Sequence, residues 1–484
     1  MDKLRRRHEP LWRAAGILGG ILASTRRVRR RHHERVLLQL AAFWFGATGT
    51  FVFPWGEATL TLEDVAALAG LPLLGGPVRA PVSDSLEKDV AAIEAVRAVL
   101  HRSKKKKAGY SAWVKRFVER APEEEAAPSA AGGGGADREA RELLEHGAYL
   151  SMWLSLFVLS GPPFDVVRQE VLPLAARLAR GQSVALAPAA LAAIYRDLSA
   201  LKRCITSDKK DEPFVVSAPA HILQLWVWEH FTQLRPEPAA SSARGDRNIP
   251  RASRWHEVSK RLSSKDVHAV FMSPKEFKWR PYGNRSLFGL QPEMGGFPVR
   301  VQDIATSEAL LSLARCLHAC ELVGMNCIQQ YSPHRVARQL GFDQDIPGTV
   351  PCASSGWEKA WETYNIEAES SAFIFPNHKP SVTVQYAKWW EPYSSACDSA
   401  IANAAEMKEG HDFVSPPKRK MEGVLAGNSG KKLRLPVATA TRGRPPNRPE
   451  GTHLLFPVLR HPCSNKTSCG STSACSRCVS TPPN

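Results

Sequence analysis

The sequence lacks apolar runs long enough to cross a membrane. The longest apolar stretches, such as Ala14 to Ala23 and Tyr149 to Val158, fall well short of the ~18 to 20 residues that a membrane-spanning helix needs. No small-residue cleavage site of the Ala-x-Ala kind follows the basic amino terminus, so a secretory signal peptide is not predicted. We therefore expect a soluble chain without a membrane partner.

Cysteine is also scarce, with 10 residues in a chain of 484. So few cysteines do not form the dense disulfide framework of a small secreted protein, and a reducing compartment fits better. Cys316 and Cys320 lie four residues apart, with His318 and Cys327 nearby, on a predicted apolar helix, and a metal ion could use this spacing. Burial as small apolar side chains is the commoner outcome for such thiols, so we predict no metal site and no cofactor.

Acidic residues are few at the two ends of the chain. Residues 1–36 contain 11 Lys and Arg against 3 acids, and residues 413–484 contain 12 against 2, which leaves residues 37–412 with a net charge of −1. This distribution is typical of a nearly neutral globular body with basic ends that bind polyanions or carry a transport signal. It argues against a body built as one nucleic-acid groove.

Two segments have little to bury. Residues 121–137 are rich in Ala, Gly and Glu, and this composition predicts a flexible insertion. Helix-poor, basic sequence predicts a disordered tail over residues 412–484. Between the ends we expect a domain over about residues 10–395, which starts within the basic amino-terminal segment 1–36.

Most of the body has the apolar spacing of amphipathic helices, so we predict a mainly α fold. The predicted helices cover residues 143–159, 164–178, 191–201, 220–231, 309–322 and 336–340. A short β-hairpin near residues 50–60 is the exception, because Pro54 and Gly56 supply turn geometry between two β-prone runs.

A short capped helix is predicted directly after the hairpin. Thr61 suits the N-cap position, and Glu63 and Asp64 place negative charge in the first turn. Gly70 suits the position after the last turn, and Pro72 stops the helix.

Several segments resemble, in order, the successive blocks of one family. They are GILASTRRVRR at 20–30, TFVFPWGEATLTLEDVAALAGLPLLGGPV at 50–78, YLSMWLSLFVLSGPP at 149–163, LPLAARLARGQSVALAPAALAAIYRDL at 172–198, ILQLWVWEHF at 222–231, ELVGMNCIQQYSPHRVARQLGFDQDIPG at 321–348 and VTVQYAKWWEPY at 382–393. On these segments the chain resembles the plant mobile domain family, which is often labelled aminotransferase-like.

The resemblance implies a helical domain of nuclear, transposon-associated proteins. Such domains occur in mobile elements and in host proteins similar to the maintenance-of-meristems and long-form phosphatase-7-like proteins. The resemblance also implies roles in transposon silencing, gene-expression control or genome maintenance, and it implies no secure enzymatic activity.

The aminotransferase label is not matched by a recognisable catalytic pattern. A pyridoxal-phosphate enzyme needs a Schiff-base lysine, a carboxylate at the ring nitrogen and a backbone cup for the phosphate, normally in an α/β framework. The sequence has no alternating strand–helix pattern and no such cup. Our first hypothesis is therefore a non-catalytic protein that acts through contacts with nuclear protein partners. The alternatives are a transposon-encoded DNA-associated accessory protein and, less favoured, a pyridoxal-phosphate-dependent aminotransferase.

The signature turn of the family is formed here by Phe53, Pro54, Trp55, Gly56 and Glu57. We expect structural roles for most of these residues. Glu57 is the exception, since a carboxylate beside Trp55 on an exposed turn is able to contact a partner.

Two basic clusters in the tail match a bipartite nuclear import signal, in which each cluster binds a separate acidic groove of an import receptor. Ten residues separate the clusters, which consist of Lys418, Arg419, Lys420, Lys431, Lys432 and Arg434. They predict a location in the nucleus.

A third tail motif matches the core of an AT-hook. It consists of Arg442, Gly443, Arg444 and Pro445. Such a core lies extended in the narrow minor groove of A·T-rich DNA, where the negative potential attracts Arg and Gly permits close approach. One isolated copy predicts, at most, loose DNA binding.

Overall fold

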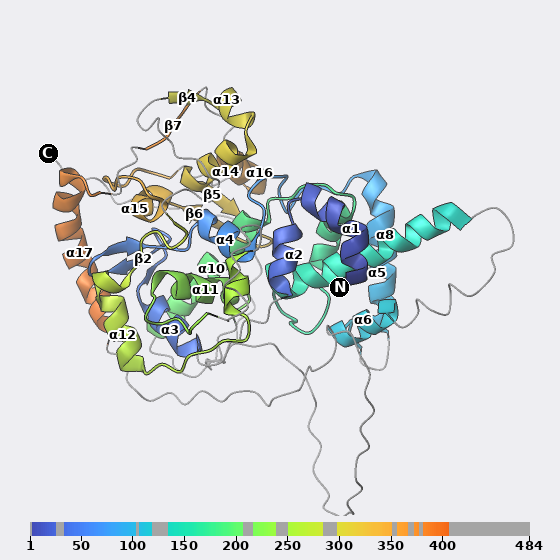
Figure 1. Cartoon of the computed structure of the whole chain (residues 1–484), viewed down its shortest axis with the longest axis horizontal. Coiled ribbons are helices and arrows are strands. Elements are labelled where there is room, and N and C mark those ends of the chain that lie inside the picture. The colour runs from blue at the N-terminus through green and yellow to red at the C-terminus, as the bar shows by residue number, and fades with distance from the viewer. Residues whose placement is uncertain are drawn as a thin grey trace, which may run out of the picture.

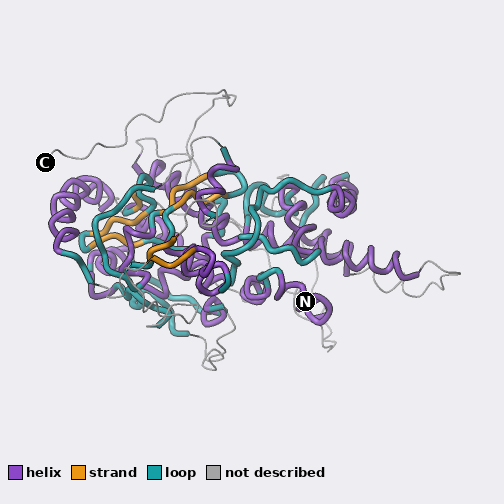
Figure 2. The backbone as a smooth tube through the Cα atoms, turned by 90° about the horizontal axis from the view of Figure 1, so that it is seen from above, coloured by secondary structure: helices purple, strands orange, loops and turns teal. Residues whose placement is uncertain are grey.

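A computed structural model describes ten stretches of the chain, namely residues 2–25, 33–102, 106–118, 134–206, 216–238, 250–283, 298–350, 356–365, 372–376 and 381–405. Helices dominate these residues and the strands are short, so the predicted mainly α fold is confirmed (Figure 1). The described residues form a larger and a smaller lobe. The strands lie in the larger lobe, whereas the smaller lobe consists of helices and loops (Figure 2).

The smaller lobe is built around a long helix, α8 (Gly134–Trp153), which continues into the π-helical turn η1 (Leu154–Val158). Around it lie α1 (Asp2–Ala14), α5 (Asp84–His101), α6 (Tyr110–Val118), the 3-10 turn η2 (Gln169–Val171) and α9 (Leu172–Ala179). Helix α2 (Leu18–Ser24) contacts α4 of the larger lobe and so links the two lobes.

The larger lobe contains the remaining helices. They are α3 (His33–Ala42), α4 (Leu62–Ala69), α10 (Leu186–Thr206), α11 (Ala220–His230), α12 (Ser264–Met272), α13 (Val301–Ala305), α14 (Glu308–Leu317), α15 (Ala337–Leu340), α16 (Trp357–Tyr364) and α17 (Val384–Ala405), with the 3-10 turns η4 (Arg251–Trp255), η5 (Pro274–Glu276) and η6 (Pro333–Val336).

The predicted hairpin is confirmed as part of a three-stranded antiparallel sheet. Its strands are β1 (Trp44–Phe45), β2 (Thr50–Phe53) and β3 (Gly56–Ala58), in that order across the sheet. Phe53 pairs with Gly56, so Pro54 and Trp55 form a two-residue loop. Two further antiparallel pairs join β4 (Pro298–Arg300) to β7 (Ala372–Ile374) and β5 (Cys320–Val323) to β6 (Ile328–Tyr331).

The capped helix after the hairpin is also confirmed, as α4. The Thr61 hydroxyl accepts a hydrogen bond from the Asp64 backbone N–H at 3.2 Å, and the Asp64 carboxylate accepts one from the Thr61 N–H at 2.7 Å. This reciprocal arrangement is a capping box. Gly70 ends the helix in the left-handed conformation, with φ at 63°.

The main hydrophobic core lies between the small sheet and the helices α3, α10 and α11. Large aromatic side chains fill it, among them the buried Trp44, Phe51, Phe53, Trp226 and Phe231. Edge-on, tilted and stacked ring pairs connect them, such as the edge-on pair of Trp44 and Phe51, with centroids 5.0 Å apart. The aromatic face of the sheet therefore packs the sheet on the core, in addition to the backbone pairing of its short strands.

Several element boundaries differ from the sequence-based prediction, and two of the differences have a clear physical reason. Helix α9 begins at Leu172 and not near residue 164, because Pro173 has no backbone N–H and fits only the first turn of a helix. Helix α14 ends at Leu317, and the residues from Cys320 to Val323 pair with β6 as a strand. Here tertiary pairing overrides the apolar spacing of a helix.

Helix α8 begins at Gly134, so the last residues of the predicted insertion belong to its first turn. An i,i+4 ion pair between Arg138 and Glu142, with Nε and Oε1 3.2 Å apart, supports this polar end of the helix. Residues 121–133 and the predicted tail, 412–484, lie outside the described residues.

Candidate functional site

The signature turn lies in the larger lobe and is mostly enclosed. Phe53 and Gly56 are buried, Trp55 is half-buried, and Pro54 alone of the five residues is exposed. The Trp55 ring stacks on Phe53 with centroids 4.7 Å apart, and its indole N–H donates to the Phe271 backbone oxygen at 2.8 Å. These contacts fit the structural role expected for the turn.

Glu57 is not on an exposed turn, so that part of the prediction is wrong. Its residue is only 2% exposed, because β3 turns the carboxylate into the lobe, where it meets Arg335 of the turn η6. Arg335 Nε donates to Oε2 and Nη2 donates to Oε1, each at 2.9 Å. The Thr50 hydroxyl donates to Oε1 at 3.1 Å. A partner cannot reach this carboxylate without displacing the residues that cover it.

Burial and pairing act on this ion pair in opposite directions. Burial raises the pKa of Glu57, while the charge and hydrogen bonds of Arg335 oppose the rise. Burial by itself lowers the pKa of Arg335, but the Glu57 carboxylate, together with Tyr393 and Tyr386, more than offsets this, so the pKa of Arg335 is raised. The guanidinium therefore stays charged, and two charge-assisted hydrogen bonds compensate the buried carboxylate.

Helix α17 covers this ion pair with aromatic rings. The guanidinium carbon of Arg335 lies 5.4 Å from the Trp389 ring centroid and 5.3 Å from the Tyr393 ring centroid, within cation–π range. The Tyr393 hydroxyl also donates to Glu57 Oε1 at 3.3 Å. The sequence block 382–393 thus closes over the signature turn from the far end of the domain.

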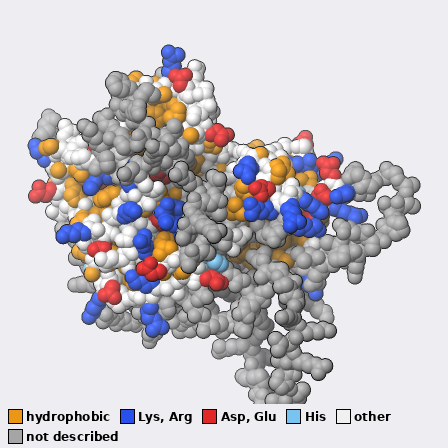
Figure 3. Space-filling view, viewed as in Figure 1, with side chains coloured by type: hydrophobic (Ala, Val, Ile, Leu, Met, Phe, Trp, Pro, Cys, Tyr) orange, Lys and Arg blue, Asp and Glu red, His pale blue; other side chains and the backbone are white. Residues whose placement is uncertain are grey.

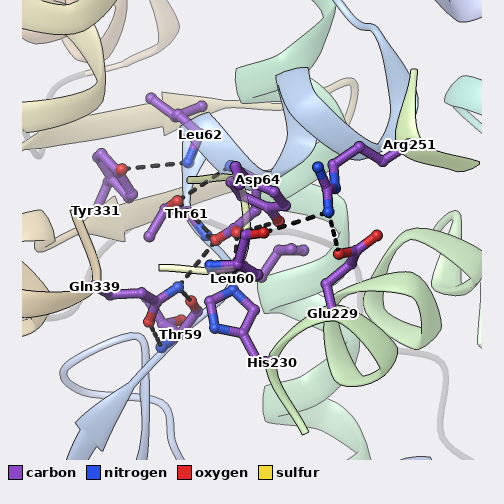
Figure 4. Close-up of polar contacts among 12 residues, drawn as sticks. Thr59, Leu60, Thr61, Leu62, Asp64, Glu229, His230, Arg251, Tyr331 and Gln339 are labelled. Carbon is purple, nitrogen blue, oxygen red and sulfur yellow. Dashed lines mark hydrogen bonds and ion pairs between the residues drawn. The ribbon is translucent and has the colours of Figure 1, made fainter. Parts of the chain in front are cut away.

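Asp64 is the centre of a second buried network (Figure 4). Its Oδ2 accepts from the Thr61 backbone N–H and hydroxyl, both at 2.7 Å, and from Gln339 Nε2 at 3.0 Å. Its Oδ1 lies 3.1 Å from His230 Nε2 and accepts from the Tyr282 hydroxyl at 2.6 Å. One carboxylate therefore ties α4 to α11, to α15 and to the segment around residue 282.

Neighbouring side chains extend this network on both sides. Gln339 also binds Thr59, accepting from its N–H at 3.2 Å and donating to its carbonyl oxygen at 2.6 Å. On the other side, Glu229 accepts from Arg251 Nη2 at 2.8 Å and from Trp255 Nε1 at 3.1 Å. Burial, together with the charges of Asp64 and Glu229, raises the pKa of Tyr282 well above its ordinary value, so this phenol donates as a neutral group.

An aspartate beside a histidine is also the arrangement of many acid–base sites. Here Asp64 is 2% exposed and His230 is 0% exposed, and the His230 ring stacks on Phe277 with centroids 4.9 Å apart. A substrate in solution has no access to either group in this conformation. The pair is suited to holding segments together.

Sequence analysis found Thr61 and Asp64 but missed His230, Tyr282, Arg335 and Gln339. Arg335 and Gln339 lie four residues apart within the family block 321–348, a spacing that places them on one side of a helical segment. This spacing of two polar side chains was the available signal. Nothing local shows that their partners lie near residues 57–64.

The three central cysteines are buried thiols, as expected, but they do not share a helix. Cys316 is on α14, Cys320 begins β5, and Cys327 lies just before β6, so the predicted i,i+4 placement of Cys316 and Cys320 is wrong. Burial raises the pKa of Cys316 well above its ordinary value and that of Cys327 to about 11. Within the described residues, no group of three His, Cys, Asp or Glu side chains is placed to hold a metal ion.

A pocket of about 330 Å³ lies in the smaller lobe, between α5, α8 and α9. Apolar side chains such as Ile93 and Leu143 line it, and its charged side chains are Lys88, Asp89, Glu139 and Arg180. Arg180 binds the Asp89 carboxylate through two hydrogen bonds of 2.8 and 3.1 Å, so these two charges satisfy each other. The pocket lies in the smaller lobe, whereas the signature turn lies in the larger one.

The remaining predicted site residues belong to the tail. The import clusters at 418–420 and 431–434 and the AT-hook core at 442–445 lie outside the described residues. The part of the chain that the structure describes has no helix of the length and apolarity needed to cross a membrane.

A comparison with known protein families identifies the class of protein to which this helical body belongs. The family model of the plant mobile domain matches residues 16–391, and the chain belongs to this family. No solved structure matches it.

Three proteins of Arabidopsis thaliana are similar to the chain. Protein MAINTENANCE OF MERISTEMS is 23% identical over 328 residues, which cover 66% of this chain and 59% of that protein. Protein MAIN-LIKE 2 is 25% identical over 325 residues, covering 63% and 41%, and Protein MAIN-LIKE 1 is 24% identical over 324 residues, covering 65% and 55%. The chain thus spans less than two thirds of the length of each of these relatives.

Proposed function

We propose that the protein is a non-catalytic nuclear interaction protein of transposon-related origin. Its helical body would hold protein partners, and its basic tail would bring it into the nucleus. The processes it would serve are transposon silencing, gene-expression control or genome maintenance, which are those implied by the resemblance to the family.

One observation carries the non-catalytic part of the proposal. Glu57 and Asp64, two acidic side chains of the family block 50–78, are buried and form their hydrogen bonds with neighbours within the chain. Catalytic acids and bases need to reach a substrate, at least in the reacting complex. Residues that serve as internal connectors fit a scaffold better than a reaction centre.

The nuclear part of the proposal is tested with the import clusters. We expect a fluorescent fusion of the full chain to enter the nucleus and the purified chain to bind an import receptor. Replacing Lys418, Arg419 and Lys420 by Ala weakens both, and replacing Lys431, Lys432 and Arg434 as well abolishes receptor binding. A matched control replaces Lys275, Lys278 and Lys359, three exposed lysines of the body. Unchanged nuclear entry after loss of both clusters would contradict this part.

The silencing part needs a cellular readout. Removing the protein from cells that make it is expected to raise transposon transcripts, and the intact chain restores their level. The variant without both import clusters is the control, because its body is unaltered. Equal rescue by this variant would show that the role does not require import through the tail.

The alternative, a transposon-encoded DNA-associated accessory protein, is supported by the basic tail and its AT-hook core. It predicts salt-sensitive binding to A·T-rich duplexes in preference to G·C-rich duplexes. Replacing Arg442 and Arg444 by Ala should remove the preference for A·T, while a variant of Arg448 and Arg460 in the same tail should keep it. Equal binding to both duplexes by the unaltered chain would dismiss the AT-hook.

The less favoured alternative, a pyridoxal-phosphate-dependent aminotransferase, is tested by the cofactor itself. Added pyridoxal phosphate would produce a Schiff-base absorbance, and borohydride reduction would attach it to one lysine. Specific labelling of one lysine at stoichiometric cofactor would overturn the non-catalytic proposal. We expect weak labelling spread over exposed lysines instead.

A further inference from the structure

A basic, exposed segment of the larger lobe takes no part in the two buried networks or in the import signal. It leads into helix α12 and has the sequence SKRLSSKD over residues 259–266. Lys260, Arg261 and Ser263 are exposed, and Ser263 is the N-cap of α12. The two cations thus lie three and two residues before a serine hydroxyl. Basophilic protein kinases select this pattern, because acidic pockets of the kinase pair with such cations while the hydroxyl enters the active site.

The backbone of this segment is extended and held by few contacts. Residues 258–263 belong to no helix or strand, and Ser263 itself has φ at −83° and ψ at 156°. No backbone hydrogen bond joins residues 259–262 to another described residue. Leu262 packs against the core, and Lys260 Nζ donates to the Gln233 backbone oxygen at 2.5 Å. Since so little holds the segment, it opens into the active site of an enzyme at low cost.

Other serines of the described residues also follow an arginine at a similar spacing, but their surroundings differ. Ser199 follows Arg196 within the helix α10, and its Oγ accepts from Trp44 Nε1 at 2.9 Å. Ser253 follows Arg251 in the 3-10 turn η4, where its hydroxyl is buried. A kinase that needs an extended chain and a free hydroxyl has no access to either serine in the folded chain.

Ser183 is the closest comparison, because it is exposed and follows Arg180 by three residues. Its backbone is paired, however, since its carbonyl oxygen accepts from the Gly76 N–H at 3.0 Å. Arg180 is bound as well, because its Nε donates to the Asp89 carboxylate at 2.8 Å. A kinase would have to break both contacts at Ser183, whereas Ser263 requires neither. The fold therefore favours Ser263 among serines with similar sequence surroundings.

We infer that Ser263 is a phosphorylation site for a basophilic serine/threonine kinase, with ATP as the phosphoryl donor. The bond between the γ-phosphorus of ATP and its β–γ bridging oxygen breaks, and a bond from the γ-phosphorus to Ser263 Oγ forms. The hydroxyl proton passes to the catalytic aspartate of the kinase, and ADP leaves. The inference goes beyond the proposed function, because it gives the body a site at which another enzyme changes its charge.

The phosphate almost neutralises the local charge. Residues 254–266 contain four Lys and Arg and two acids, a net charge of +2, and a phosphoserine adds about −1.5 to −2. Figure 3 shows Lys and Arg side chains on the lower left of the larger lobe, where α12 lies in Figure 1. The same helix contacts the signature turn, since Trp55 Nε1 donates to the Phe271 backbone oxygen at 2.8 Å. The modification thus changes the charge at the start of a helix that holds the signature turn.

The test uses the purified full chain, Mg-ATP and the catalytic subunit of cyclic-AMP-dependent protein kinase as the basophilic kinase. Mass spectrometry of proteolytic peptides measures the phosphate at each serine over time. We expect Ser263 of the folded chain to be phosphorylated and Ser183 to remain unmodified. Ser263→Ala should remove this phosphate, whereas Ser264→Ala should keep it at Ser263. Circular dichroism checks that each variant is folded.

A second variant tests whether the kinase recognises the two cations. In Lys260→Gln/Arg261→Gln the initial rate of phosphorylation at Ser263 should fall by at least about tenfold, because close charge pairs across an interface contribute strongly to binding. The matched control is Lys275→Gln/Lys278→Gln, which removes the same charge from exposed positions of the same lobe. This control should keep the rate of the unaltered chain.

Three results would overturn the inference. The first is no phosphate at Ser263 of the folded chain, and the second is an equal rate in the two double variants. The third is phosphorylation of Ser183 as fast as that of Ser263, because the surroundings described above would then decide nothing. None of these results bears on nuclear import, which is measured separately through receptor binding by the unmodified chain.

Discussion

Glu57 and Arg335 form a buried ion pair between residues 278 positions apart in the sequence. The pair joins β3 to the turn η6, and Trp389 and Tyr393 of α17 close over it. The first strands of the domain and its last helix are thus connected through one guanidinium group. Several consequences of this relationship, and of the Asp64 network beside it, can be measured.

Glu57→Gln should destabilise the fold by about 3–5 kcal/mol, because it leaves the Arg335 guanidinium buried without its counter-charge. Urea unfolding followed by tryptophan fluorescence measures the change. Glu94→Gln is the control, since its ion pair with Arg97 is partly exposed and is worth about 1 kcal/mol or less. In the double variant Glu57→Gln/Arg335→Met, the loss should be smaller than the sum of the two single losses. Simple additivity would show that the two residues act independently.

Asp64→Asn should disrupt the second network. An amide keeps one acceptor oxygen but puts an NH₂ donor where Asp64 now accepts bonds, so either the Tyr282 or the Thr61 side of the network loses its partner. We expect a loss of about 2–4 kcal/mol in the free energy of unfolding, since hydrogen bonds to charged groups contribute about 1.5–3 kcal/mol each. Asp266→Asn, in the exposed first turn of α12, is the matched control and should change stability by less than about 1 kcal/mol. Similar losses in both variants would mean that Asp64 acts only as a helix cap.

Acid should weaken the attachment of α1 to α8 through two stacked histidines. His8 and His146 have ring centroids 3.9 Å apart, and His146 Nε2 accepts from Trp12 Nε1 at 2.8 Å. Burial lowers the pKa of His146 from 6.5 to about 3, with a further contribution from the charge of His8. Burial and the charge of the neighbouring Arg7 also lower the pKa of His8, although the negative charges of Glu145 and Glu142 act to raise it.

The unfolded chain therefore binds protons below pH 6.5 that the folded chain does not. The stability contributed by the neutral His146 is complete above pH 6.5 and falls by about 1.4 kcal/mol for each pH unit below it, until pH about 3 is reached. Unfolding free energies at pH 7 and pH 5 measure this loss. His146→Gln should remove much of the pH dependence, whereas His101→Gln, at an exposed position, should keep it. An unchanged profile in His146→Gln would assign the acid sensitivity elsewhere.

Gly70→Ala should be strongly destabilising because two requirements meet at this residue. Its φ of 63° favours glycine, and a Cβ atom would lie 2.6 Å from the Gly19 carbonyl carbon and 2.6 Å from Pro250 Cγ. We expect a loss above about 1 kcal/mol, well beyond the effect of backbone entropy alone. Gly348→Ala is the control, since a Cβ there meets nothing within 4 Å. Thermal unfolding measures the melting temperature of both variants, and Gly70→Ala should have the lower one. Equal melting temperatures would contradict the close approach of α2 to the end of α4.

Much of the local structure follows from short-range chemistry, and the sequence predicted it. Three local features depend only on neighbours within a few residues: the capping pattern of Thr61 and Asp64, the helix end at Gly70 and the turn at Pro54. They can therefore be predicted from the sequence without knowledge of the fold. The same holds for the apolar spacing that produced α10 and α11. The family resemblance, carried by whole blocks of sequence, was confirmed by the match over residues 16–391.

Other features were decided only when distant segments met. The sequence neighbours of Glu57 predict an exposed turn position. Its burial depends instead on Arg335, Trp389 and Tyr393, which come from distant segments. Cys320 lies in a strand because its backbone pairs with β6, although the neighbouring residues in the sequence have the apolar spacing of a helix. His230 and Tyr282 become partners of Asp64 through packing that no local pattern encodes.

The sequence by itself determined the helix caps, the turn, the mainly helical class and the family, because each depends on local preferences or on the similarity of contiguous blocks. The tertiary structure alone decided which charged groups are buried and with whom they pair. The physical reason is that burying a charge is favourable only when a counter-charge and hydrogen-bonding groups arrive at the same place, and here they arrive from segments up to 336 residues apart.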